Sequence, residues 1–93
     1  MEIGVEISLY PLATDFIPPI QDFIDRLNAD GRCKVLTNSM STQIFGRYED
    51  VFEVLLREIR TTFAHNDKAV FVMKVLGPLS AALSPPSAGE RAG

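Results

Sequence analysis

The chain has 93 residues, of which 46% are hydrophobic and 23% are charged, and its net charge is −3. This length suits one domain rather than two, and the composition is typical of a globular protein. Nucleic-acid binding depends on clustered basic side chains, and because the sequence has no such cluster it argues against a nucleic-acid partner.

The N-terminal residues and the cysteine content bear on the compartment. The first ten residues, MEIGVEISLY, contain neither the basic segment nor the long apolar segment of a signal peptide. No apolar run reaches the length of a membrane span, and the single cysteine, Cys33, cannot form an intrachain disulfide. We therefore expect a cytoplasmic protein without a membrane-inserted segment.

The first two elements are predicted to be a strand and a helix. Apolar and polar residues alternate over residues 2–10, which predicts a half-buried strand. Apolar residues then recur at helical spacing, which predicts a helix with Pro18 and Pro19 in its first turn. We expect Asp15 to cap this helix and Gly31 to end it.

A hairpin, a second helix and a last strand follow. Short apolar runs predict strands over 33–37 and 42–46, and the polar stretch NSMSTQ lies at the turn between them. A helix is predicted to begin at Tyr48, with acidic residues in its first turn. The last strand is predicted over 68–76, and we expect the Gly-Pro pair that follows to break it.

The predicted order β-α-β-β-α-β indicates the fold class. Its simplest closure is an α+β, ferredoxin-like sandwich, in which a four-stranded antiparallel sheet carries both helices on one face. We expect this domain to span residues 1–76. Residues 77–93 are rich in Pro, Ser and Ala, and we expect them to form a loose C-terminal tail.

The face of the sheet that the helices do not cover is called the far face below. The last two strands carry apolar residues on both of their sides: Ile44, Phe45, Val70, Phe71, Val72 and Met73. Since a large uncovered apolar patch is unusual on a monomer, we predict a homo-oligomer, a dimer or tetramer, that forms through the sheet face. We expect Phe71 and Met73 to make that contact. A ligand cleft on the far face is the alternative, and both can hold together.

The sequence carries no recognisable catalytic or metal-binding motif. His65 is the only histidine and sits where a helix ends, where it suits the helix dipole better than catalysis. Cys33 has no second cysteine or spaced histidine beside it. The glycines form no phosphate-binding loop. We predict no catalytic residue, no metal site and no cofactor, and hence a protein that is not an enzyme.

A polar strip is the remaining candidate site. The first strand and the hairpin are expected to bring these side chains together on the far face: Glu6, Ser8, Tyr10, Asn38, Ser41 and Thr42. Amides and hydroxyls pair with ring nitrogens, and Tyr10 or Phe45 could stack on a ring, so the strip would suit a flat polar heterocycle. Spacing alone leaves open that Glu6 and Ser8 are ordinary solvated residues.

Two motifs carry a resemblance to a known family. The segments SLYPL-x-x-DFI and MSTQIFG-x-Y-x-x-V, together with KAVFVMKVL, resemble the thiamine-binding, YkoF-like family over about residues 2–76. The resemblance implies a ferredoxin-like domain that pairs through its sheets into dimers or tetramers. It also implies binding of thiamine or its hydroxymethylpyrimidine moiety without any reaction.

The resemblance assigns the matched positions to the candidate site: Ser8, Tyr10, Asn38, Ser41 and Thr42. The Glu6 carboxylate could pair with the positive charge of the thiazolium ring of thiamine. The sequence therefore predicts a non-catalytic binding protein that acts in transport, salvage or sensing. The alternative is a structural or regulatory oligomer whose far face serves only subunit contact.

Overall fold

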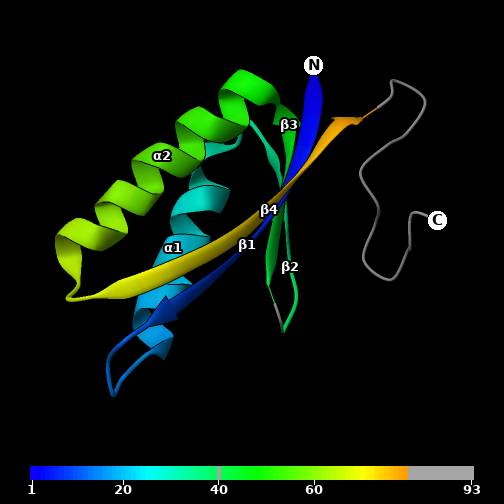
Figure 1. Cartoon of the computed structure of the whole chain (residues 1–93). Helices are drawn as coiled ribbons and strands as arrows, with labels where there is room; N and C mark the ends of the chain where they lie inside the picture. The colour runs from blue at the N-terminus through cyan, green and yellow to red at the C-terminus, as the bar shows by residue number, and fades with distance from the viewer. Residues whose placement is uncertain (40, 80–93) are drawn as a thin grey trace.

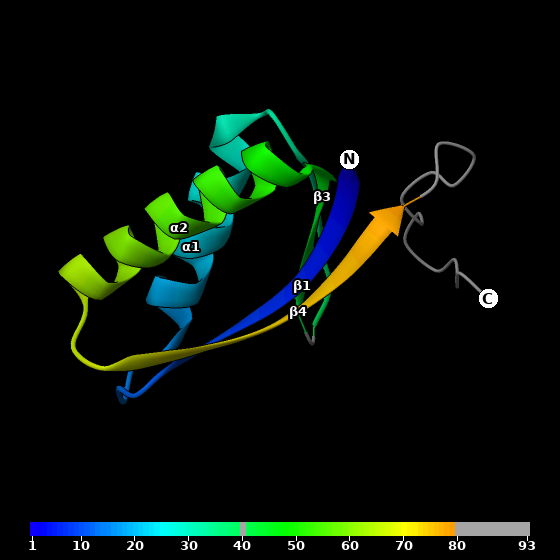
Figure 2. The same ribbon diagram turned by 45° about the horizontal axis from the view of Figure 1, so that its top comes forward.

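Six elements follow one another in the order β-α-β-β-α-β, as a computed structural model shows for residues 1–39 and 41–79 (Figure 1). Their bounds are β1 Glu2–Pro11, α1 Ile17–Asp30, β2 Lys34–Thr37, β3 Thr42–Arg47, α2 Tyr48–His65 and β4 Ala69–Leu79. The strands form one antiparallel sheet in the order β2-β3-β1-β4. Both helices lie on the same side of it (Figure 2). The ferredoxin-like α+β prediction is confirmed.

The core lies between β1, β3 and the two helices. The apolar residues of β1, at every second position, are all buried: Ile3, Val5, Ile7 and Leu9. They meet Phe23 and Leu27 of α1, and Val51 and Leu55 of α2. The alternation of β1 therefore places its apolar face against the helices and its polar face on the far face.

The ends of α1 follow the prolines and the glycine rather than the predicted cap. Phe16, not Asp15, is the N-cap residue, and in the described part of the chain no side chain caps the helix by a hydrogen bond. Pro18 and Pro19 lie in the first turn, and Gly31 ends the helix at φ 80°, the left-handed conformation that favours glycine. The prediction for Gly31 is confirmed, and that for Asp15 is wrong.

The last strand is longer than predicted. We expected Gly77 and Pro78 to break it after residue 76, but β4 continues through both to Leu79, which pairs with Glu2 of β1. The register between β1 and β4 shifts between Glu2 and Gly4, so the ladder is irregular where β4 ends. The predicted tail lies outside the described residues from residue 80 onward.

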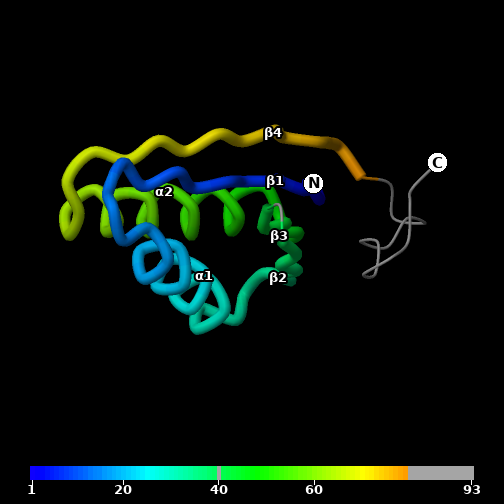
Figure 3. The backbone as a smooth tube through the Cα atoms, turned by 90° about the horizontal axis from the view of Figure 1, so that it is seen from below, coloured from blue at the N-terminus to red at the C-terminus, as the bar shows by residue number. Residues whose placement is uncertain are grey.

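β4 forms the outer edge of the sheet, beside β1 and on the side away from α1 (Figure 3). Phe71 turns toward the helices, where its ring centroid lies 5.0 Å from that of Phe23 and 5.5 Å from that of Phe63. Met73 lies two residues further along β4 and therefore points to the same side of the sheet as Phe71, but 41% of it is exposed. The expectation that these two residues make a far-face contact is therefore wrong. The far-face residues of β4 are Val70, Val72, Lys74 and Leu76, which pair with the even-numbered residues of β1.

Phe45 is buried although it points to the far face. Its cross-strand partner is Gly4, and a Cβ atom on Gly4 would lie 2.7 Å from Cε1 of the Phe45 ring. Only 7% of Phe45 is exposed, so the ring lies across the β1 backbone where a side chain would otherwise stand. This packing removes Phe45 from the solvent-facing strip that we predicted.

An ion-pair network joins the C-terminal end of α1 to α2. Asp30 accepts hydrogen bonds from Arg32 Nε (2.9 Å) and from Arg57 Nη2 (2.7 Å). The bond from Arg32 is the main reason, and the bond from Arg57 the second, that the pKa of the Asp30 carboxyl lies well below its ordinary value. Burial alone would raise the pKa of Glu58, but hydrogen bonds from Arg26 and Arg57 lower it.

We expect the network to make stability depend on pH in the acid range. A carboxyl whose pKa is lower in the folded chain contributes stability above its unfolded pKa, about 3.9 for Asp, and loses that contribution as the pH falls toward the folded value. Urea unfolding should therefore show a steep loss of unfolding free energy below about pH 4. Asp30→Asn should flatten this loss, and equal slopes for both chains would contradict the role of Asp30.

Candidate ligand-binding pocket

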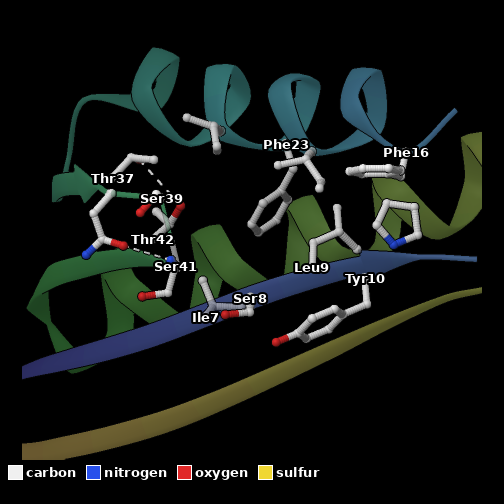
Figure 4. A pocket seen from close by; sticks show the side chains of 14 residues that line it. Ile7, Ser8, Leu9, Tyr10, Phe16, Phe23, Thr37, Ser39, Ser41 and Thr42 are labelled. Carbon is white, nitrogen blue, oxygen red and sulfur yellow. Dashed lines mark hydrogen bonds between the residues drawn. The ribbon is translucent and has the colours of Figure 1, made fainter.

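A pocket of about 380 Å³ opens where β1 runs past the beginning of β3 (Figure 4). β1 pairs with β3 only as far as the Ile7–Thr42 partners, but with β4 as far as Pro11 and Ala69. Within the described part of the chain, the last four residues of β1 therefore have a paired strand, β4, on one edge only. The pocket occupies the space between their other edge, α1 and the β2–β3 hairpin.

One wall of the pocket is apolar and comes from α1 and the residue before it. This wall consists of Phe16, Ile20, Phe23 and Ile24, and Leu9 of β1 points toward it (Figure 4). Aromatic and aliphatic groups on one side suit the face of a flat ring. Sequence reasoning missed this wall because the apolar spacing of α1 was assigned wholly to the core. The available signal in the sequence was an aromatic residue, Phe16, directly before the helix.

The opposite wall is polar and comes from the β2–β3 hairpin, in which a side chain also forms a hydrogen bond with the main chain of the hairpin. The Asn38 N–H donates to the Ser41 carbonyl (3.0 Å), and the Ser41 N–H donates to Asn38 Oδ1 (2.9 Å). The hydroxyl oxygens of Thr37 and Thr42 lie 3.4 Å apart. All four residues line the pocket. Asn38 and Ser41 thus combine turn formation with a polar lining.

The structure gathers five of the seven predicted residues at the pocket: Ser8, Tyr10, Asn38, Ser41 and Thr42. Thr42 was expected on the far face, and that placement is wrong. It shares the parity of Ile44, pairs with the buried Ile7 and is only 5% exposed, so it faces the helix side. Ser8 and Tyr10 have the opposite parity to Leu9, and Tyr10 lies on the β4 side of β1 in Figure 4.

Glu6 and Phe45 do not line the pocket. Glu6 Oε2 accepts a hydrogen bond from Ser41 Oγ (3.1 Å), and its Oε1 lies 3.6 Å from Lys74 Nζ. The Glu6 carboxylate therefore lies on the far face and contacts the lining of the pocket through Ser41. Phe45 lies over Gly4, away from the opening. Of the predicted strip, the charged group and one aromatic ring thus fall outside the cavity.

Among the side chains that the structure describes, the histidine, the cysteine, the lysines, the arginines and the carboxylates do not line this pocket. His65 is exposed at the end of α2, where its Nδ1 lies 3.0 Å from the carbonyl of Thr61. Cys33 packs against the core, and burial raises the pKa of its thiol. Over residues 1–39 and 41–79, no group of three His, Cys, Asp or Glu residues is placed to hold a metal ion. Within the same residues, no helix is both long and apolar enough to span a membrane.

Solved structures share this fold. The hypothetical protein MJ1052 from Methanocaldococcus jannascii superposes with a TM-score of 0.73 at 20% identity, over 84% of this chain and 81% of that chain. Protein SP2199 from Streptococcus pneumoniae superposes with a TM-score of 0.70 at 15% identity, over 85% of this chain and 89% of that chain.

A third structure comes from Thermotoga maritima. This protein, TM0486, has been assigned provisionally to thiamine biosynthesis or salvage; it superposes with a TM-score of 0.66 at 16% identity, over 84% of this chain and 85% of that chain. No curated protein matches the sequence at a significant level. The model of the YKOF-related family matches residues 2–84. The segments that carried the resemblance lie within this range, and the chain belongs to the YkoF-related family.

Proposed function

We propose that this protein binds thiamine or its hydroxymethylpyrimidine moiety, without performing a reaction, and serves transport, salvage or sensing. The observation that carries the proposal is the pocket itself, in which an apolar wall from α1 faces a polar hairpin across about 380 Å³. Membership of the YkoF-related family supports the choice of ligand. The provisional thiamine assignment of the Thermotoga maritima protein adds to that support.

The chemistry of the ligand matches the two walls. A pyrimidine ring has two apolar faces, which suit Phe23 and Ile24, and an edge of donors and acceptors, which suits the hydroxyls of Thr37 and Thr42. The volume lies near the lower end of the range for small-molecule sites, about 300 to 1,000 Å³. A ligand of one or two small rings therefore suits this pocket better than a dinucleotide.

Calorimetry tests the proposal directly. Titration of the purified chain with thiamine and with hydroxymethylpyrimidine should show saturable binding at one site per chain, with a Kd below about 10 µM, or about −7 kcal/mol. The separate thiazole moiety serves as the control and should bind much more weakly. An absence of binding heat with both pyrimidine compounds would contradict the proposal.

Self-association through the sheet is the second part of the proposal. Three far-face residues of β4 are largely exposed: Val70 (45%), Val72 (51%) and Leu76 (64%). Tyr10, the cross-strand partner of Val70, is 53% exposed and extends this apolar surface onto β1. A long apolar edge strand normally pairs or is covered. This surface also favours the alternative function, an oligomer whose far face serves only subunit contact.

We expect Val72→Asp to dissociate the oligomer, because it would place a charge in the middle of this apolar surface. Sedimentation velocity should show the change as a shift to the monomer. Leu56→Asp is the matched control, since Leu56 is equally apolar and 65% exposed but lies on α2. A native chain that is monomeric at all concentrations, or an unchanged profile for Val72→Asp, would contradict contact through this face.

A further inference from the structure

Among residues 1–39 and 41–79, no strand pairs with the last residues of β1 on the edge that faces the pocket. In an antiparallel ladder, the N–H and C=O of one residue point to the same neighbouring strand, and consecutive residues alternate. The N–H of Leu12 donates to the carbonyl of Lys68 at 3.1 Å, across from β4. Even-numbered residues of β1, including Tyr10, therefore direct their main-chain groups to β4, and Leu9 directs its groups to the opposite edge.

The hairpin gives the same alternation independently. The Asn38 N–H donates to the Ser41 carbonyl across the β2–β3 turn, so the main-chain groups of Ser41 face β2, and those of Thr42 face away from β2 and toward β1. The partner of Thr42 on β1 is Ile7, which is odd-numbered like Leu9. The ladder between β1 and β3 ends at this pair. Among the described residues, no strand pairs with the next odd-numbered residue, Leu9, on this edge.

The open edge lies where a ligand would be held. Leu9 lines the pocket, and its side chain turns toward Phe23 (Figure 4). Its N–H and C=O thus point into a cavity with an apolar wall on one side and the Thr37 and Thr42 hydroxyls on the other. A donor and an acceptor held by a strand at fixed spacing are complementary to a ring nitrogen beside an exocyclic amine.

We propose that the Leu9 main chain recognises the amidine edge of an aminopyrimidine: its N–H donates to the ring nitrogen, and its C=O accepts from the adjacent amine. This inference rests on the proposed function and adds the groups that select the ligand. Selection through the main chain would leave the hairpin side chains to shape the pocket. It would also explain why β1 continues four residues past its last pairing with β3.

Hydrogen exchange of the ¹⁵N-labelled chain tests this geometry. The Leu9 amide should exchange rapidly in the free chain, and saturation with hydroxymethylpyrimidine should slow its exchange by about tenfold or more. The amides of Ile7 and Tyr10 are internal controls, since both face neighbouring strands and should be protected throughout. A Leu9 amide whose exchange does not change while the ligand is bound would overturn the inference.

A second measurement uses a ligand analogue that lacks one of the two proposed hydrogen-bonding groups. The analogue 5-hydroxymethyl-2-methylpyrimidine lacks the amine and would leave the Leu9 carbonyl unpaired, so it should bind about tenfold more weakly or worse. Equal affinity for both compounds would overturn the inference and leave the proposed function intact. If hydroxymethylpyrimidine itself gives no binding heat, the proposed function fails and the inference fails with it.

Discussion

Replacing Ile24 with Trp should strongly weaken the binding of hydroxymethylpyrimidine. Ile24 lines the pocket from α1, is only partly buried and does not belong to the main cluster of buried core residues. An indole at this position would occupy space that the ligand needs, while the core between β1 and the helices stays as it is. We expect calorimetry to show a loss of affinity of a hundredfold or more, about 3 kcal/mol.

The matched control places the same side chain on the same helix but outside the pocket. Gln21 is exposed on α1 and does not line the cavity. Gln21→Trp should therefore bind ligand like the native chain, and both variants should retain native circular dichroism. If Ile24→Trp binds with native affinity, the ligand does not occupy this pocket.

Replacing Arg26 with Met should destabilise the folded chain by about 3 kcal/mol. The Arg26 guanidinium bridges the helices: it donates to the carboxylate and the carbonyl of Glu58, and to Thr62 Oγ1 at 2.7 Å. Thr62 is 1% exposed and Glu58 is 7% exposed, so neither could recover these bonds fully from water. Met keeps much of the apolar stem and removes the donors.

Urea unfolding measures this effect as a lower midpoint at an unchanged slope. Arg60→Met is the control, because Arg60 is exposed on α2 and its loss should change the unfolding free energy by less than about 0.5 kcal/mol. About 3 kcal/mol is a large part of the stability of a small domain. Equal midpoints for the two variants would show that the bridge contributes nothing measurable.

The strands and helices could be predicted because their patterns are local. The alternation of β1 fixed its buried face, and Gly31 marked the end of α1. The predicted cap failed for a local reason as well. With Phe16 as N-cap, Pro18 and Pro19 stand where the N–H groups that a capping side chain would bind are normally found, and proline has none.

The end of β4 could not be predicted because it depends on the position of the strand in the sheet. A Gly-Pro pair stops a central strand, since proline cannot donate to a neighbour. β4 is an edge strand, so Pro78 can face the open side without loss of a ladder hydrogen bond. The prediction that Phe71 lies on the far face failed for a similar reason. Which residues of β4 point to the far face depends on the register between β4 and β1.

The pocket lay beyond sequence reasoning for the same physical reason. Ser8, Tyr10, Asn38 and Ser41 are among the lining residues that the sequence suggested, but the apolar wall is not, and the shape of the pocket depends on where β3 begins relative to β1. It depends also on how α1 crosses the open edge. Neither feature is local. Thr42 was placed on the wrong side because successive residues of a strand point to opposite faces, so Ser41 and Thr42 could not both lie on the far face.

The most direct test of the account is a crystal structure of the chain with bound hydroxymethylpyrimidine. We predict that the ring lies between the α1 wall, represented by Phe23 and Ile24, and the hairpin residues Thr37 and Thr42. Its amidine edge should face the Leu9 main chain. A ring bound instead on the far face, beside Glu6 and Val72, would contradict the assignment of this pocket as the binding site.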